Sequence, residues 1–498
     1  MALFDLSLSP KNTKKEQDRV LKKLLRRAKN TAFGSTYEFG ALLKSKTPAK
    51  DFQKAVPIFN YNKIYKEWWV KSIEGESDVC WPGTIKYFAL SSGTSEASSK
   101  YIPVTNELLA GNKAIMVKQL LSLRHYKNIP YASIAKGWLA IGGSTELQKG
   151  TGFYAGDLSG ITAKKLPAWF QPFYKPGKKI AKEKDWNKKL EEIVAEAPNW
   201  DIGFLVGVPA WIQLCIEMII KKYELKNIHE LWPNLSFFGH GGVSFEPYKK
   251  GFEKLLGKPI TYIETYLASE GFIAYQDHQN AAGMRLVTGQ HLFLEFVPFN
   301  ENNFDGDGEI KENATALLID EVEEGSEYAI LISTAAGAWR YLIGDTIKFI
   351  DKDNAQIIIT GRTKHFLSLV GEHLSVDNMN KAVETVSRNF NISIPEYTVT
   401  GVPYGNMFAH KWYIACNDAV NENELATAID SYLCSINDDY ATERKSALQD
   451  VAVQIIKEET VRGFMESEGK LGGQHKFPRV LKGAQLAAFL RFIDKKQI

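Results

Sequence analysis

The N-terminal part of the chain contains a segment in which apolar positions recur at helical spacing. Residues 14–30 (KKEQDRVLKKLLRRAKN) place Val20, Leu21, Leu24 and Leu25 among charged side chains. Apolar residues three and four positions apart form a single stripe on a helix. The pattern therefore predicts an amphipathic surface helix whose basic face meets solvent rather than an anionic membrane.

From Lys86 onward, short apolar runs are each followed by a glycine-containing turn and then by helical periodicity. The clearest examples are IKYFALSSGTS, GWLAIGG, DIGFLVGVPAWIQLCIEMIIKKY, and LSFFGHGG followed by EPYKKGFEKLL. Repetition of strand, glycine turn and helix is typical of α/β proteins with a mainly parallel sheet. We therefore expect a large α/β domain with mainly parallel strands.

Two later stretches differ from this pattern. Residues 284–360 hold β-rich runs with few helical segments between them, which predicts a more antiparallel sheet or a small β-barrel-like subdomain. After Gly361, strand-like runs alternate with helical periodicity, as in an α+β domain. A boundary near Gly361–His365 would divide the chain into an N-terminal domain of residues 1–361 and a small, mobile C-terminal domain of residues 362–498.

Composition narrows the class of protein. The 498 residues are 44% hydrophobic and 24% charged, which is the usual balance for a soluble globular protein of two or three domains. A formal net charge of +3 is too small to indicate nucleic acid or a stable membrane association. We expect a monomer by default.

The cysteines and the N-terminus indicate a cytoplasmic protein. The four cysteines are far apart and form no CxxC or CxxH pattern, so neither a zinc site nor a disulfide framework is expected. We expect Cys215 and Cys434, in apolar stretches, to be buried thiols. The first residues contain no apolar signal region, and the longest apolar run, 204–220, is interrupted by Pro209 and Glu217.

Residues 91–100 combine small hydroxyl residues, a glycine and a terminal lysine directly after the apolar run YFAL. They read Ser91-Ser92-Gly93-Thr94-Ser95-Glu96-Ala97-Ser98-Ser99-Lys100. Such a loop lets the backbone approach a ligand and offers N–H and O–H donors that suit a polyphosphate. The P-loop motif GxxxxGK[ST] is absent from the chain. Taken alone, these residues are also compatible with a surface turn.

A second candidate segment, YIETYLASEGF (262–272), places Tyr266, Ala268, Ser269 and Glu270 after an apolar strand. A carboxylate at a strand end can hold Mg²⁺, and a neighbouring aromatic ring can cover a base. An exposed charge at the end of a strand is the alternative.

A third segment, AWRYLIGDTIKF (338–349), places Arg340, Gly344 and Asp345 in an apolar β context. A buried aspartate needs hydrogen-bond partners, and the two hydroxyls of a ribose would supply them. A turn aspartate after Gly344 is the alternative.

These three segments, in this order, resemble the three ATP-binding motifs of the acyl acid amido synthetases. That family includes the plant auxin-responsive enzymes that join amino acids to jasmonate or auxin, and it belongs to the adenylate-forming superfamily of acyl-CoA synthetases and luciferases. The family motifs SSGTSxGxxK, YxxSE and YRxxxGD correspond here to SSGTSEASSK, YLASE and WRYLIGD. The chain departs from them at Ala97 and Trp339, and Leu342 stands where plant members often carry arginine. TAFGSTYEF, ITGRTKHFLSLVGEHLS and QHKFPRVLKG extend the resemblance over nearly the whole chain.

The resemblance implies a site for ATP and Mg²⁺. Ser91, Ser92, Gly93, Thr94 and Ser95 would cradle the phosphates, with Lys100 supporting the loop. Tyr266, Ala268 and Ser269 would lie near adenine, Gly241 and Gly242 would allow backbone packing against it, and Glu270 would anchor Mg²⁺. Asp345 would accept from the ribose, Arg340 would brace that region, and Arg362 would reach the ribose or pair with an acid. His240 is expected to be a hydrogen-bonded structural histidine.

Lys476 is the candidate for a mobile catalytic lysine that neutralises charge near the α-phosphate. A long-stemmed ammonium suits a group that must travel, and the neighbouring glycines suit a moving loop. The expected reaction is adenylation of a carboxylic acid, followed by transfer of the acyl group to an amine, which the family resemblance makes an amino acid. The alternatives are an acyl-CoA ligase and a nucleotide-binding protein that has lost catalysis. The identity of the acid and of the amine stays open.

Overall fold

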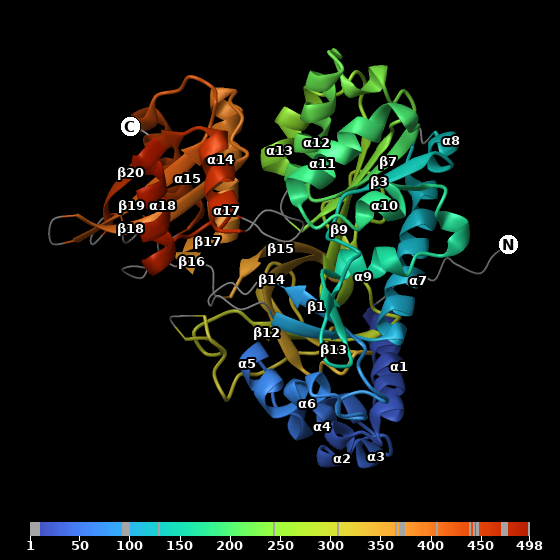
Figure 1. Ribbon diagram of the computed structural model, residues 1–498. Coiled ribbons are helices and arrows are strands. Elements are labelled where there is room, and N and C mark those ends of the chain that lie inside the picture. Colours follow the sequence, from blue (N-terminus) through green and yellow to red (C-terminus); the bar gives the residue numbers. More distant parts are fainter. Residues whose placement is uncertain are drawn as a thin grey trace.

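The computed structural model describes residues 10–91, 100–127, 130–242, 245–305, 308–363, 366–367, 374–404, 407–437, 440–441, 444, 448–469 and 477–496. We call residues 10–363 the large unit and residues 374–496 the C-terminal unit. Figure 1 shows the C-terminal unit, in orange and red, beside the upper part of the large unit.

One mixed sheet of eleven strands forms the centre of the large unit. Its order is β12-β13-β14-β15-β11-β10-β9-β8-β7-β3-β6. Strands β6, β3, β7, β8 and β9 are parallel, and the strands from β9 through β10 to β12 pair antiparallel. The strands are β3 (Gly137–Ala140), β6 (Tyr174–Lys175), β7 (Ile202–Gly207), β8 (Phe237–Gly241), β9 (Thr261–Ala268), β10 (Gly271–Tyr275), β11 (Met284–Leu286), β12 (Leu292–Pro298), β13 (Glu327–Thr334), β14 (Tyr341–Asp351) and β15 (Gln356–Arg362).

This sheet corrects one expectation and confirms another. The run of residues 284–360 does form antiparallel strands, but they continue the parallel strands as one sheet instead of closing a separate small barrel. The join is made by β11, which pairs with both β10 and β15. A mixed sheet results, whereas the sequence pattern predicts a mainly parallel one.

Helices cover both faces of the parallel strands, because successive strand residues point to opposite sides. On one face, Phe238 packs with Ile212, Ile216 and Phe252 of the covering helices. On the other face, Phe237 packs with Phe204 and Leu123. The helices are α7 (Asn106–Ser122), α8 (Tyr131–Ile134), α10 (Gly177–Ala181), α11 (Trp186–Glu196), α12 (Pro209–Lys222) and α13 (Glu246–Glu253). A further helix, α9 (Leu158–Lys164), packs instead on the strand Tyr87–Ser91.

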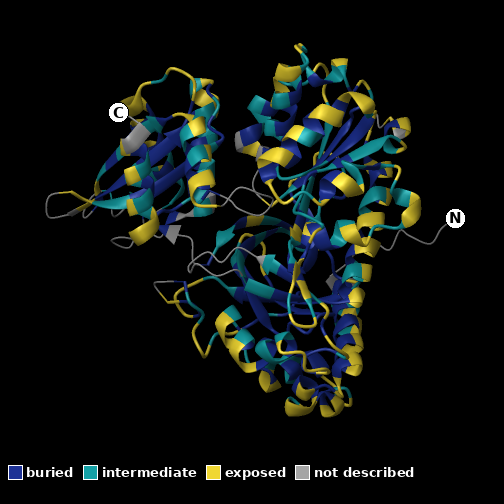
Figure 2. Ribbon diagram, viewed as in Figure 1, coloured by how far each residue is buried: buried dark blue, intermediate teal, exposed yellow. Residues whose placement is uncertain are grey.

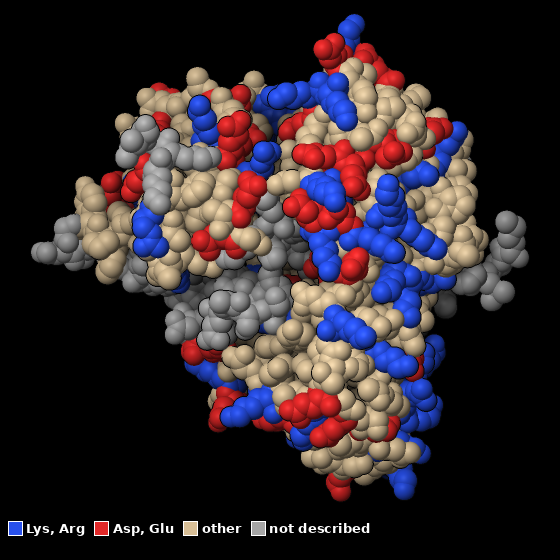
Figure 3. Space-filling model, viewed as in Figure 1, with Lys and Arg blue, Asp and Glu red and all other residues tan. Residues whose placement is uncertain are grey.

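The N-terminal helices pack on the antiparallel strands, at the bottom of Figure 1. The expected amphipathic helix is α1, which buries Val20, Leu21, Leu24 and Leu25 against the same core as β12. Figure 3 shows Lys and Arg gathered along the edge where α1 lies in Figure 1. The N-terminal helices are α1 (Pro10–Ala28), α2 (Ala32–Thr36), α3 (Phe39–Leu42), α4 (Pro48–Ala55), α5 (Tyr61–Ile64) and α6 (Val70–Ile73). A small second sheet has the order β2-β1-β5-β4. Its strands are β1 (Tyr87–Ser91), β2 (Lys100–Val104), β4 (Gln148–Lys149) and β5 (Tyr154–Gly156).

The C-terminal unit has its own sheet, ordered β18-β19-β20, and its own buried clusters. Figure 2 shows buried residues inside this unit and exposed residues along its outer surface. Its elements are β17 (Leu374–Ser375), which pairs with β16 (Phe366–Leu367), α14 (Val376–Phe390), β18 (Glu396–Tyr404), β19 (Met407–Ala415), α15 (Glu422–Ile436), β20 (Leu448–Ile456), α17 (Glu458–Ser467) and α18 (Gly483–Lys496).

The cysteines are free thiols, as expected. Cys80, Cys215 and Cys416 are buried, whereas Cys434 is half-buried, so the expectation of a buried thiol is confirmed for Cys215 and wrong for Cys434. Among the described residues, no helix combines the length and the apolar character that crossing a membrane would need.

Candidate functional site

A cavity of about 2190 Å³ lies between the large unit and the C-terminal unit. The carboxyl ends of the parallel strands open into it, which is where ligands bind in α/β sheets. Side chains of both charges border the cleft between the two units in Figure 3. Its lining includes most of the described candidates, namely Lys100, Gly241, Gly242, Tyr266, Ala268, Ser269, Glu270, Asp345 and Arg362.

Some candidates fall outside the described residues. Strands β1 and β2 pair antiparallel, with Ser91 opposite Lys100, so the predicted phosphate loop joins two paired strands. The backbone of Ser91 ends β1. Ser92, Gly93, Thr94, Ser95 and Lys476 lie outside the described residues.

A hydrogen-bonded network joins Tyr266 of β9 to β14 and β15. The Tyr266 hydroxyl donates to Asp345 Oδ2 at 2.5 Å. Arg362 Nε pairs with Asp345 Oδ1 at 2.9 Å, and an Arg362 terminal nitrogen donates to the Ile343 carbonyl at 3.2 Å. Asp345 and Arg362 stand opposite each other in the β14–β15 register. Of the two roles expected for Arg362, the structure contains the pairing with an acid.

Burial and neighbouring charges alter the pKa of two members of this network. Burial, followed by the nearby Asp345 carboxylate, raises the pKa of Tyr266 well above its usual value. Asp345, despite the opposing effect of burial, raises the pKa of Arg362. Tyr266 is therefore a neutral donor and Arg362 a permanent cation.

Glu270 lies in the tight turn between β9 and β10, where Ala268 pairs with Gly271. Glu270 is only 7% exposed to solvent. Burial raises the pKa of Glu270, and Asp345 adds to this effect, while Lys100 and Arg362 oppose it. Glu270 thus lies at the end of a strand as expected, and the alternative of an exposed charge there is wrong.

Tyr341, which the sequence reasoning missed, is a further member of the site. It is fully buried, and burial, followed by the nearby Glu270 charge, raises the pKa of Tyr341 well above its usual value. Lys100 places its ammonium 5.3 Å from the centre of the Tyr61 ring, a cation–π distance. Tyr341 lies within the third motif, directly after Arg340. This position in the motif is the sequence signal that could have identified Tyr341.

The backbone at Gly241 and Gly242 favours glycine for two different reasons. A Cβ on Gly241 would lie 2.3 Å from the Thr265 carbonyl oxygen of the neighbouring strand. Gly242 has φ of 83°, a left-handed conformation that glycine adopts without strain. The chain therefore leaves β8 close to β9, at the rim of the cavity.

His240 precedes these glycines and lines the cavity. Its ring stacks on Phe245 at 4.6 Å between centroids, and its Nδ1 is buried without a hydrogen-bond partner. Burial lowers the pKa of His240 to about 4, so the ring is neutral at pH 7. The expectation of a hydrogen-bonded histidine is not met at Nδ1.

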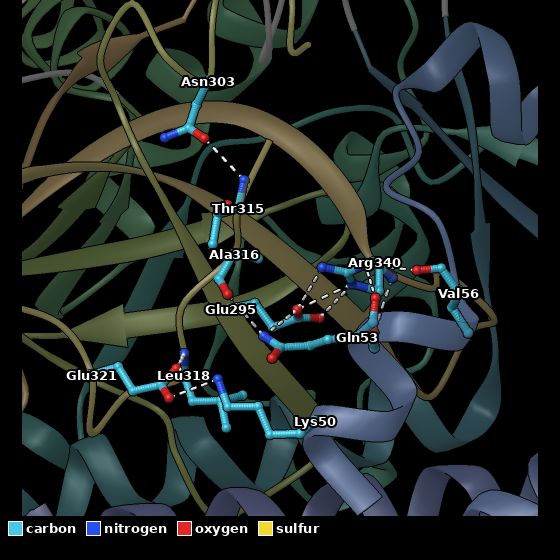
Figure 4. Close-up of polar contacts among 11 residues, drawn as sticks. Lys50, Gln53, Val56, Glu295, Asn303, Thr315, Ala316, Leu318, Glu321 and Arg340 are labelled. Carbon is cyan, nitrogen blue, oxygen red and sulfur yellow. Dashed lines mark hydrogen bonds and ion pairs between the residues drawn. The ribbon is translucent and has the colours of Figure 1, made fainter. Parts of the chain in front are cut away.

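Arg340 is not brought together with the other candidates. Its Nε lies 3.1 Å from both carboxylate oxygens of Glu295, and one terminal nitrogen donates to the carbonyls of Gln53 at 2.8 Å and Val56 at 2.6 Å. Figure 4 shows the guanidinium between Glu295 and helix α4. Arg340 is absent from the described lining of the cavity. The structure therefore gives it a role in packing α4 on the sheet.

Models of one family match this chain in three consecutive parts. The GH3 family N-terminal domain matches residues 3–194, the central domain residues 285–360 and the C-terminal domain residues 377–485. The chain is also similar to the jasmonoyl–L-amino acid synthetase JAR6 of Nicotiana attenuata, with 22% identity over 98% of this chain and 94% of that protein. The indole-3-acetic acid-amido synthetase GH3.4 of Arabidopsis thaliana is 26% identical over 41% of this chain and 36% of its own length.

Solved structures agree on the fold. The GH3.15 acyl acid amido synthetase superposes with a TM-score of 0.78 at 16% identity, covering 97% of this chain and 93% of that chain. A 2-hydroxyisobutyryl-CoA ligase superposes with a TM-score of 0.60 at 11% identity, covering 99% and 93%. The chain belongs to the GH3 family.

Proposed function

We propose that this member of the GH3 family is an ATP-dependent acyl acid amido synthetase. It activates a carboxylic acid as an acyl-AMP with release of pyrophosphate, and it transfers the acyl group to the amine of an amino acid. The observation that carries the proposal is the Tyr266–Asp345–Arg362 network beside the buried Glu270. Two of the three motif segments thus meet at one end of a single cavity.

The nucleotide would lie along the ends of β8 and β9 and beside Asp345 of β14. Adenine would pack between the Gly241–Gly242 backbone and Tyr266. Asp345 would accept hydrogen bonds from the ribose hydroxyls, with Arg362 holding its carboxylate in place. The phosphates would run toward the loop that begins at Ser91, where backbone N–H groups and hydroxyls supply donors.

Mg²⁺ would be held by Glu270 together with the phosphates and water. The described residues contain no group of three or more His, Cys, Asp or Glu that could hold a metal by themselves. This suits Mg²⁺, which in nucleotide sites keeps several waters and takes one or two carboxylates plus phosphate oxygens. When bound, the ion would neutralise charge on the phosphates.

In the first step, a carboxylate oxygen of the acid attacks the α-phosphorus and the bond to pyrophosphate breaks. The protein contributes by position and charge, since no covalent enzyme intermediate is needed. Lys476 would supply positive charge at the α-phosphate. In the second step, the amine attacks the acyl carbon and AMP leaves. Closure of a C-terminal domain beginning near residue 362 would protect the acyl-AMP from water.

The test is pyrophosphate release from ATP and Mg²⁺ with a panel of carboxylic acids, each with amino acids, with CoA or with no acceptor. Acid-dependent release, together with an amide product when an amino acid is present, would support the proposal. A thioester formed with CoA and no amide with any amino acid would replace it with a CoA ligase. Binding of ATP without release across the panel would favour a nucleotide-binding protein that has lost catalysis.

A further inference from the structure

The C-terminal unit meets the large unit where α14 and the start of β18 face α13. Two of the polar contacts between them lie at the surface, namely Lys250 with Asn391 and Asn187 Nδ2 with Glu466 Oε1 at 3.0 Å. Exposed contacts of this kind stabilise little. Units joined by such an interface move relative to each other by default, so a buried contact would determine which orientation is favoured.

Among the described residues, a further contact across this interface lies deeper, between a buried tyrosine and a half-buried glutamate. The Tyr248 hydroxyl of α13 donates to Glu396 Oε1 at the start of β18, and Tyr248 is only 3% exposed. The other oxygen of Glu396 pairs with Arg479 Nη1 at 2.5 Å. Arg479 also donates to the Tyr397 carbonyl at 3.2 Å and lies 4.5 Å from the centre of the Tyr397 ring. The carboxylate of Glu396 thus binds the large unit with one oxygen and its own unit with the other.

The electrostatics of this cluster favour an intact bond. Burial, and then the Glu396 carboxylate, raise the pKa of Tyr248 well above its usual value, so the hydroxyl stays protonated and remains a donor. Burial alone would lower the pKa of Arg479, and Glu396 more than offsets this, so Arg479 stays charged. A hydrogen bond to a charged acceptor is stronger than one between neutral groups.

Other charges at the interface act against closure. Glu458 of α17 lines the cavity with Glu217 of α12. Burial raises the pKa of Glu458, and the like charges of Glu217, Asp418 and Glu396 raise it further. Glu217 belongs to the large unit, and it repels Glu458 of the C-terminal unit across the cleft. The orientation therefore depends on an attractive contact elsewhere.

Arg479 connects this contact to the cavity. Its carbonyl accepts from the Val399 N–H at 2.9 Å, and the Leu481 N–H donates to the Val399 carbonyl at 3.1 Å, so the segment is fixed on β18. Phe477, Pro478 and Arg479 line the same cavity as Glu270 and Asp345. Holding Glu396 against Tyr248 therefore holds this segment at the wall of the cavity.

We propose that Tyr248 is a positioning residue, whose bond to Glu396 holds the C-terminal unit in the orientation that serves adenylation. The assignment to adenylation rests on the proposed function. In this proposal the unit leaves this orientation for acyl transfer and the bond breaks, so Tyr248 should affect the first step and not the second.

The first experiment uses Tyr248→Phe and needs no catalysis. Asn187→Cys with Glu466→Cys places two thiols where the wild-type side chains touch, and a short bifunctional maleimide then reports how often the units adopt this orientation. We expect the crosslinking rate to fall about twofold or more, because loss of a hydrogen bond to a charged group shifts the closing equilibrium by roughly tenfold. The control is Tyr223→Phe, whose hydroxyl bonds the Val194 and Ala195 carbonyls inside the large unit. Equal rates in both variants would overturn the proposal.

The second experiment separates the two steps. Tyr248→Phe should slow pyrophosphate release by the same factor as crosslinking, about twofold or more, and it should leave amide formation from supplied acyl-AMP unchanged. Equal loss in both steps would overturn the positioning role, because a general loss of structure affects both. If wild-type protein released no pyrophosphate with any acid, the proposed function would fail, and the crosslinking result would still decide the role of Tyr248.

Discussion

Replacing Arg340 tests whether this residue acts in packing or in catalysis. Arg340 and Glu295 are 5% and 1% exposed, and the guanidinium reaches both carboxylate oxygens within 3.1 Å. Arg340→Met keeps a long apolar side chain and removes the positive charge. Of the contacts of Glu295 drawn in Figure 4, only the hydrogen bond from the Gln53 amide, at 3.0 Å, would then remain. Methionine is preferable to glycine because Arg340 has φ of 43°, and glycine would relieve that strain.

The expected cost is large. Removing one partner of a buried ion pair destabilises a protein by about 3–5 kcal/mol, because the other charge is left buried without compensation. Typical domains are stable by only about 5–15 kcal/mol. Arg340→Met should therefore remove a major share of the free energy of unfolding. The double variant Arg340→Met, Glu295→Leu removes both charges and should recover much of the loss.

Urea unfolding followed by tryptophan fluorescence measures this effect. The matched control is Arg27→Met, which breaks an exposed pair with Glu107 and should cost at most about 1 kcal/mol. An unchanged urea midpoint for Arg340→Met, with adenylation abolished, would refute the packing argument. It would instead give Arg340 the role at the nucleotide that its motif suggests.

Further predictions concern the cavity. Asp345→Asn should lower kcat/KM for pyrophosphate release by roughly 10–100-fold, since a charged acceptor for Tyr266 and Arg362 is lost; steady-state kinetics measure this. Glu270→Gln should abolish Mg²⁺-dependent release and yet raise the melting temperature at pH 8. The pKa of Glu270 is raised in the fold, so its ionised form opposes folding, and the gain over wild type should vanish below the ordinary pKa of a glutamate. Chelation of Mg²⁺ should stop pyrophosphate release, and added Mg²⁺ should restore it; release that survives chelation would contradict the Glu270 assignment.

The sequence predicts the parallel strands and the glycine turns because these depend on local periodicity. It does not predict that residues 284–360 continue the same sheet, since that depends on the pairing of β11 with β10 and β15. Arg340 illustrates the same limit at the level of one residue. Its partner, Glu295, is the single charge in the apolar strand LFLEFVP. A charge there requires a partner, but the strand pattern alone does not identify which one.

The charges around the cavity explain why a member of this family would need both a metal ion and a moving lysine. Glu270 and Asp345 carry negative charge, and Lys100 and Arg362 are the cations that act on Glu270. Arg362 is already paired with Asp345. A bound polyphosphate adds further negative charge to a partly buried region, where repulsion is weakly screened. We therefore propose that positive charge arrives with the nucleotide, as Mg²⁺ at Glu270, and with Lys476, which lies outside the described residues. The α-phosphate would then become electrophilic when the two units close.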